Sequence, residues 1–137
     1  MKALTIFDIS SRAMSAQQVR LNAVASNLAN AQTLTTSADK AYRAMRPVFE
    51  AEFPMHQAST GVATVSAVEM QRSKVEPEKR YTPGHPLADP DGYVYASNVD
   101  VNEELVDMME ASRQYQNNIE VLATAKSLIL KTLSVGK

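Results

Sequence analysis

The last third of the sequence constrains the fold most strongly, because apolar and aromatic residues recur in it in alternating steps of three and four. This spacing is the a/d pattern of a helix that forms a coiled-coil seam. The positions in the series are Leu105, Met108, Ser112, Tyr115, Ile119, Leu122, Lys126, Ile129 and Leu133. Only Ser112 and Lys126 among them are neither apolar nor aromatic. The segment is therefore predicted to form one long amphipathic helix.

The sequence also marks where this helix begins and ends. Asp100 is a favoured capping residue, and Glu103 three residues later completes the pattern of a capping box. Gly136 is the first Gly or Pro after that start and is the expected end. At about 1.5 Å per residue such a helix is roughly 50 Å long, which is too long for a compact domain of 137 residues. We therefore expect it to need a partner along its length.

A second helix is predicted from residue 5 to residue 30, with Thr5 and Asp8 as its capping box. A stripe that repeats every seven residues indicates packing and not cofactor binding. The stripe consists of Phe7, Met14, Leu21 and Leu28, and Val24 belongs to a second column three residues further on. The obvious partner within the chain is the C-terminal helix, which would give a two-helix hairpin with a long insertion between its arms.

The insertion has a different periodicity. Residues 31–41 are rich in Thr and Ser and are predicted to form a loop. Residues 41–53, interrupted at Pro47, and residues 61–70 alternate in the manner of strands. Several prolines make residues 76–91 irregular or extended, and the turn that ends at Gly92 leads into a short strand, Tyr93 to Tyr95. The fold class predicted is mainly α with a small, Pro-rich β insertion.

Composition excludes several classes of function. The formal net charge is −1, so neither a nucleic-acid footprint nor a polybasic membrane patch is indicated. The absence of cysteine excludes disulfides and thiolate metal sites. Polar residues from Asp8 onward interrupt the N-terminal segment, so we expect neither a cleavable signal peptide nor a membrane span.

No group of residues has the spacing of a catalytic or metal site. His56 and His85 are the only histidines and stand in separate irregular segments. Asp89 and Asp91 resemble the opening of a calcium loop, but Asn98 stands where that loop needs Glu, so a turn is favoured. An acidic cluster on the first turns of the C-terminal helix is explained by the helix dipole; it comprises Glu103, Glu104, Asp107 and Glu110. We predict no cofactor, no metal and no enzymatic activity.

The C-terminal helix has two further features. Its amide-rich midsection is either a solvated face or a device that sets register between packed helices; the residues are Gln114, Gln116, Asn117 and Asn118. Beyond them Leu128, Ile129 and Leu130 are apolar in succession, which no single face can bury. This predicts a bundle of helices from several chains. Because two helices with one narrow seam bury little area, we also expect them to be partly disordered in the isolated monomer.

Three stretches of the sequence resemble one protein family. Residues 26–33, Ser-Asn-Leu-Ala-Asn-Ala-Gln-Thr, are similar to the N-terminal signature of the axial proteins of the bacterial flagellum, the rod and hook subunits. Residues 84–89, Gly-His-Pro-Leu-Ala-Asp, and 98–101, Asn-Val-Asp-Val, resemble in particular a basal-body rod subunit. Asn117 departs from the family pattern, in which Ala usually follows Tyr-Gln.

The resemblance implies a structural subunit of the proximal rod, the drive shaft, that transmits torque. Such subunits leave the cytosol without a cleaved signal through the flagellar type III apparatus and polymerise in the periplasm. Residues 1–36 and 98–137 would form the tube-forming coiled-coil domain, and residues 37–97 the module outside it. The implied partners are copies of itself, other rod proteins, neighbouring basal-body rings and the export apparatus.

The predicted assembly interface comprises the apolar residues of both helices together with three asparagines. It consists of Phe7, Met14, Leu21, Val24, Asn27, Leu28, Asn30, Leu105, Met108, Tyr115, Asn117, Ile119, Leu122, Ile129 and Leu133. Two alternatives stay open: another axial protein of the same family, although the hook and distal-rod subunits carry larger insertions, and a cytosolic helical export adaptor or chaperone.

Overall fold

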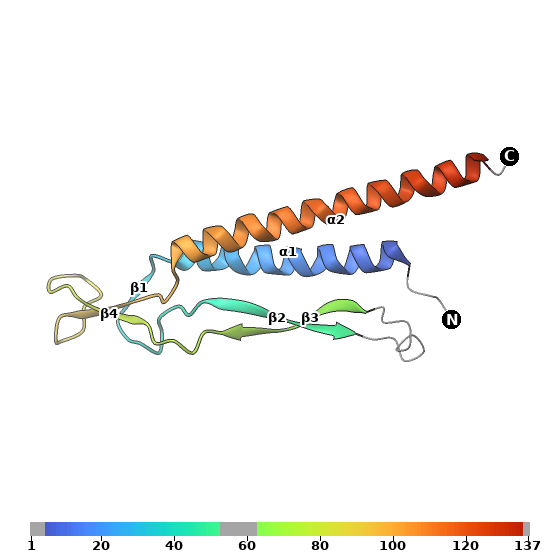
Figure 1. The fold of residues 1–137 in the computed structure, drawn as a ribbon. Coiled ribbons are helices and arrows are strands. Elements are labelled where there is room, and N and C mark those ends of the chain that lie inside the picture. Colours follow the sequence, from blue (N-terminus) through green and yellow to red (C-terminus); the bar gives the residue numbers. More distant parts are fainter. Residues whose placement is uncertain (1–4, 53–62, 136–137) are drawn as a thin grey trace.

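The computed structural model describes residues 5–52 and 63–135. Two helices and a β hairpin lie in three layers, with α1 in the middle, α2 on one side and β2–β3 on the other (Figure 1). The elements in chain order are α1 (Ile6–Asn30), β1 (Leu34–Thr35), β2 (Met45–Glu52), β3 (Thr64–Arg72), β4 (Glu78–Tyr81), β5 (Tyr93–Ala96) and α2 (Val101–Val135). The prediction of two long terminal helices around a β-rich middle is confirmed.

The caps that the sequence indicates define where both helices start. Before α1, the Thr5 hydroxyl accepts from the Asp8 amide at 3.2 Å, and the Asp8 carboxylate accepts from the Thr5 amide at 3.0 Å. Before α2, the Asp100 carboxylate accepts from the Asn102 amide at 2.8 Å. The carboxylate of Glu103 differs from its predicted role, because it accepts from the Arg46 side chain at 3.3 Å.

The helices run antiparallel, because Gln17 of α1 meets Gln114 of α2 while Arg20 meets Asp107. They separate gradually towards the C-terminal end of α2, which extends past the start of α1 (Figure 1). The last turns of α2 therefore have no neighbour from α1.

The strands form two antiparallel sheets. β2 pairs with β3 from Met45 opposite Arg72 to Glu52 opposite Thr64, with an irregularity between Val48 and Phe49. Pro47 lies inside β2, which a two-stranded sheet tolerates because each strand has a free edge. The other sheet has the order β1-β5-β4, and it places residues 34–35 in a strand where the sequence predicted only a loop.

The turn before β5 forms as predicted. The Gly92 amide donates to the Asp89 carbonyl at 2.9 Å, and Gly92 has φ +83°, which glycine adopts without strain. The Asp89 carboxylate accepts from the amides of Asp91 and Tyr93 at 3.0 and 2.8 Å. His85 accepts from the Leu87 amide at 3.1 Å and so stabilises a turn. His56 lies outside the described residues.

Candidate assembly interface

The structure divides the predicted stripe of α2 into two columns with different environments. Met108, Tyr115 and Leu122 are half-buried, and Ala111 and Ala125, three residues after Met108 and Leu122, are buried. Leu105, Ile119 and Leu133 of the other column are exposed, at 40%, 46% and 66%, and Ile129, which continues the first column, is also exposed, at 48%. The first column is therefore partly covered within the chain as far as Leu122, and the apolar residues of the second column face outward.

The buried surface between the layers is built mainly from small residues. The fully buried positions of the two helices include Ser10, Ala16, Ala23, Ala111 and Ala125. Small side chains let two helix backbones approach closely, but each buries little apolar area. The larger apolar side chains of α2 therefore stay on the outside of the single chain.

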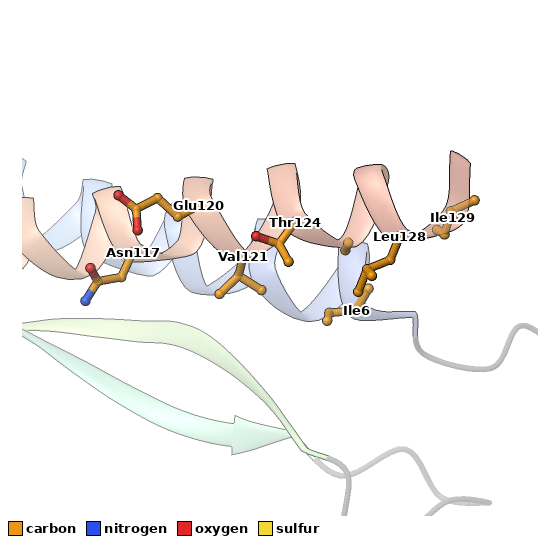
Figure 2. A pocket seen from close by; sticks show the side chains of 8 residues that line it. Ile6, Asn117, Glu120, Val121, Thr124, Leu128 and Ile129 are labelled. Atoms are coloured by element: carbon orange, nitrogen blue, oxygen red, sulfur yellow. The ribbon is translucent and has the colours of Figure 1, made fainter. Parts of the chain in front are cut away.

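An apolar hollow of about 630 Å³ lies where the end of α2 passes the start of α1. Figure 2 shows Val121 and Leu128 on α2 on the side of Ile6, which comes from α1. Ile129, which is 48% accessible, also lines this hollow, and Leu130, which is 57% accessible, continues the exposed apolar surface beyond it. The run from Leu128 to Leu130 is thus exposed on several sides of one helix, and the single chain covers none of them fully.

The predicted stripe of α1 is divided in the same way. Phe7 is exposed, and Met14, Leu21 and Leu28 are half-buried. Val24 is buried, because α1 is covered by α2 on one side and by the hairpin on the other.

Asn27 has no exposed surface, and its contacts are within the chain. Its side-chain oxygen accepts from the Met45 amide at 2.8 Å and from the Tyr42 hydroxyl at 3.0 Å. Its side-chain nitrogen donates to the Met45 carbonyl at 2.9 Å. The amide group thus pairs with the first residue of β2 as a neighbouring strand would.

A second asparagine, Asn98, binds Ala44, the residue before Met45. The Asn98 oxygen accepts from the Ala44 amide at 2.8 Å, and its nitrogen donates to the Val75 carbonyl at 2.7 Å. Asn30 serves its own helix by donating to the Ser26 carbonyl. The sequence indicated Asn27 through the family signature, but no periodicity could reveal that its partner is Met45.

A charge cluster joins three elements around the start of α2. Arg46 from β2 donates to Asp107 at 2.8 Å and to Glu103, and lies 3.5 Å from Glu104. Arg20 from α1 donates to the other oxygen of Asp107 at 2.9 Å. The side chain of Glu104 is 2% exposed, and one of its oxygens finds no hydrogen-bond partner in the described part of the chain. The helix dipole alone therefore does not account for these acids, which bind arginines of α1 and β2.

The amide-rich midsection has mixed environments. Gln114 accepts from Gln17 at 2.8 Å and donates to Glu110 at 2.7 Å. This hydrogen bond from Gln114, together with the nearby positive charge of Arg113, lowers the pKa of Glu110 below its usual value. Asn117 is exposed and lines the apolar hollow. Gln114 thus makes a contact between the two helices, whereas Asn117 lies on the exposed surface.

Residues 5–52 and 63–135 contain no group of acidic, histidine or cysteine side chains arranged to hold a metal ion. No helix within these ranges is long and apolar enough to cross a bilayer. The features that dominate this part of the molecule are helical surfaces and the contacts that position them.

Two family models match the ends of the chain. Residues 7–34 match the model described as flagella basal body rod protein. Residues 91–135 match the model described as flagellar basal body rod FlgEFG protein C-terminal.

Curated proteins match over the whole length of both chains. The sequence is 51% identical to a flagellar basal-body rod protein FlgC of Salmonella typhimurium and 48% identical to one of Escherichia coli O157:H7. It is 45% identical to the protein of the same name from Yersinia enterocolitica. Each of these matches covers 100% of this chain and of the relative.

Proposed function

Because the chain belongs to the FlgC family of flagellar basal-body rod proteins, we propose that it builds the rod by joining the exposed apolar surfaces of its helices to other subunits. The chain is a structural subunit of the basal body, as its relatives are named. The observation that carries the proposal is the exposure of Leu128, Leu130 and Leu133 on a helix whose fully buried apolar residues are the alanines Ala111 and Ala125.

The energetics favour a partner for this surface. Burying a leucine side chain contributes about 1.5–3 kcal/mol relative to leaving it in water, and α2 carries a series of large apolar side chains at least 40% exposed. The series comprises Val101, Leu105, Val106, Met109, Ile119, Val121, Leu128, Ile129, Leu130 and Leu133. An exposed apolar surface of this extent is typical of an interface. Helices of neighbouring subunits would cover it, as coiled coils of a tube.

The interface proposed is narrower than the apolar stripes of the sequence. Phe7, Leu105, Asn117, Ile119, Ile129 and Leu133 reach a neighbour directly, because all are exposed. Met14, Leu21, Leu28, Met108, Tyr115 and Leu122 are half-buried and contribute their outer edges. Val24 and Asn27 are buried, so they act by holding α1 against the rest of the chain.

In this proposal residues 1–36 and 98–137 form the rod core, and residues 37–97 form the module outside it. The rod is the proximal part of the drive shaft, and close-packed helices give it the stiffness that torque transmission needs. The chain reaches the periplasm through the flagellar export apparatus without a cleaved signal. Its neighbours are copies of itself, other rod proteins and the surrounding rings, and it has no enzymatic role.

Fractionation of cells tests the proposal against an export adaptor. A rod subunit co-purifies with detergent-extracted basal bodies, whereas an adaptor stays in the soluble fraction. Cross-linking to the neighbours within those basal bodies separates a proximal rod subunit from another axial protein. A chain found only in the soluble fraction of motile cells would overturn the proposal.

The isolated chain offers a second test. Because much of α2 lacks a neighbour, we propose that the terminal helices are partly disordered in dilute monomer. Far-UV circular dichroism should then show less helix than the two helices would give. Full helix content with a cooperative melt would contradict this part of the proposal.

A further inference from the structure

Between α1 and α2 the buried residues offer little to fix how far one helix is shifted along the other. Ala111 and Ala125 stand on the buried side of α2 and present the same small methyl group. A seam of small, similar side chains specifies axial position weakly, since a shifted helix meets an almost identical surface. Polar groups that must meet a partner across the seam specify the register more strictly.

A network of hydrogen-bonded polar side chains crosses this seam. Glu110 and Gln114 of α2 lie one turn apart, and the Gln114 nitrogen donates to the Glu110 carboxylate at 2.7 Å. The Gln114 oxygen then faces α1 and accepts from the Gln17 nitrogen at 2.8 Å. One turn further along α1, Arg20 donates to Asp107 of α2 at 2.9 Å.

The chemistry of these groups allows one orientation of the two amides. An ionised carboxylate only accepts hydrogen bonds, so Gln114 must turn its nitrogen towards Glu110 and its oxygen towards Gln17. Gln17 must therefore donate to Gln114 through its side-chain nitrogen. This leaves the side-chain oxygen of Gln17 buried without a hydrogen-bond partner among the described residues. An orphaned buried acceptor destabilises the fold, so this amide pair is not optimised for stability.

We infer that Gln17 and Gln114 form a register lock, which fixes the axial position of α2 against α1 at a cost in stability. Buried polar pairs have this effect between coiled-coil helices, where a shifted register leaves the polar groups facing apolar ones. In a register shifted by seven residues the two amides would stand about 10 Å apart along the axis and could not meet.

The lock has a consequence for the exposed surface. The apolar hollow is lined by Ile6 from α1 and by Val121 and Leu128 from α2 (Figure 2). These residues come together in this register, and a shift of α2 would separate them. The lock therefore keeps intact the surface that, under the proposed function, a neighbouring subunit covers.

The test uses the full chain with cysteines introduced at two exposed positions, Asn22 of α1 and Gln116 of α2, because the sequence has no cysteine of its own. Spin labels on these cysteines report the distance between the helices. Labelled chains are diluted into unlabelled ones, so that only distances within one chain are measured. Conditions are chosen in which circular dichroism shows both helices formed.

With Gln17 and Gln114 intact, the distance distribution should be narrow. In the Gln17→Leu, Gln114→Leu double variant it should broaden or gain a second peak displaced along the axis, while the melting temperature rises or stays unchanged. The matched control replaces two exposed amides of the same helices, Gln18→Leu and Asn102→Leu, and should leave the distribution narrow.

A double variant that keeps the narrow distribution would overturn the lock, whatever its melting temperature. A double variant that is less stable but holds the same register would show that the amide pair only stabilises the fold. Either result leaves the rod function untouched, because cell fractionation measures that function independently.

Discussion

At the scale of single residues, two asparagines fix the backbone at the start of β2, the first strand of the hairpin. The Asn27 side chain accepts a hydrogen bond from the Met45 amide and donates one to the Met45 carbonyl. The Asn98 side chain accepts one from the adjacent amide of Ala44. Both asparagines belong to the stretches of sequence that resemble the flagellar axial proteins. Both side chains hydrogen-bond to backbone atoms of the same chain, so these residues of the family signature help to fix the shape of the subunit.

Replacing Asn27 by Ala should destabilise the chain by about 2–4 kcal/mol, because the amide and the carbonyl of Met45 both lose their partner in a buried site. Chemical denaturation of the purified chain measures this loss. Asn22→Ala, at an exposed position of the same helix, is the control and should change stability by less than about 0.5 kcal/mol. Equal effects of the two substitutions would show that the Asn27 contacts contribute little.

Arg46 and Glu104 form an ion pair of unequal exposure. The side chain of Glu104 is 2% exposed, and that of Arg46 is 51% exposed. Arg46→Met should destabilise the chain by about 2 kcal/mol, since it leaves the Glu104 charge less compensated. In a Glu104→Gln background the same substitution should cost about half as much, because no buried charge remains.

The control for this cycle is Arg12→Met. Arg12 binds Glu52 at 2.7 Å, but both side chains are about half-exposed, so the loss should stay below about 1 kcal/mol. If Arg46→Met costs the same with and without Glu104, the two residues are not coupled.

At the scale of elements, α1 and α2 follow from local sequence signals, but their packing does not. The caps Thr5 and Asp100 predict the starts of both helices to within one residue. The apolar stripe favoured Leu105 and Ile119 for the seam, because they are more hydrophobic than Ala111 and Ala125. Periodicity identifies the most apolar face, but it cannot tell whether that face packs within one chain or between chains.

The strands also differ in how far local sequence signals predict them. β2, β3 and β5 lie close to the predicted strands, since their alternation and the turn at Gly92 are local signals. β1 has two residues and forms by pairing Leu34 with Ala96, far away in sequence. No local pattern can predict a pairing of that kind.

Helix α2 also carries a pH-dependent contact. The hydrogen bond from Gln114 and the positive charge of Arg113 lower the pKa of Glu110 from its usual 4.5. A carboxylate with a lowered pKa contributes stability that is fully present above its unfolded pKa and is lost as the pH falls through the folded value. The loss therefore begins near pH 4.5 and continues below it.

Glu110→Gln should flatten the pH dependence of the unfolding free energy below that value, by a small amount because the group is solvent-exposed. Denaturation midpoints of both chains across the acidic range measure the difference. The control is Glu69→Gln, which changes an exposed carboxylate on β3. A slope that Glu110→Gln leaves unchanged would show that Gln114 does not favour the ionised form.

At the scale of the whole molecule, small and large apolar residues lie in different places. Small ones are buried where α1, α2 and the hairpin meet, and most of the large ones on α2 are exposed. The sequence indicated a helix buried on several sides, and a single chain does not bury it. This incomplete burial is what a subunit of a polymer requires, because a chain that covered its own apolar surface would gain little by joining others.

The central claim is that the outer apolar surface of α2 serves other subunits and not the fold of its own chain. Leu128→Glu tests it, because Leu128 is 60% exposed and lines the apolar hollow. A buried charge at an interface costs several kcal/mol, whereas the same charge in water costs little. Val75→Glu, at a residue 67% exposed in the β module, is the matched control. By contrast, Leu122→Asp should damage the chain itself as well as assembly, because Leu122 is half-buried within the single chain.

The most direct measurement is the amount of each variant recovered in detergent-extracted basal bodies, together with the circular dichroism of the purified chain. We predict that Leu128→Glu is absent from basal bodies and has the dichroism spectrum of the unmodified chain, while Val75→Glu is incorporated normally. Recovery of Leu128→Glu in basal bodies at the normal level would contradict the account.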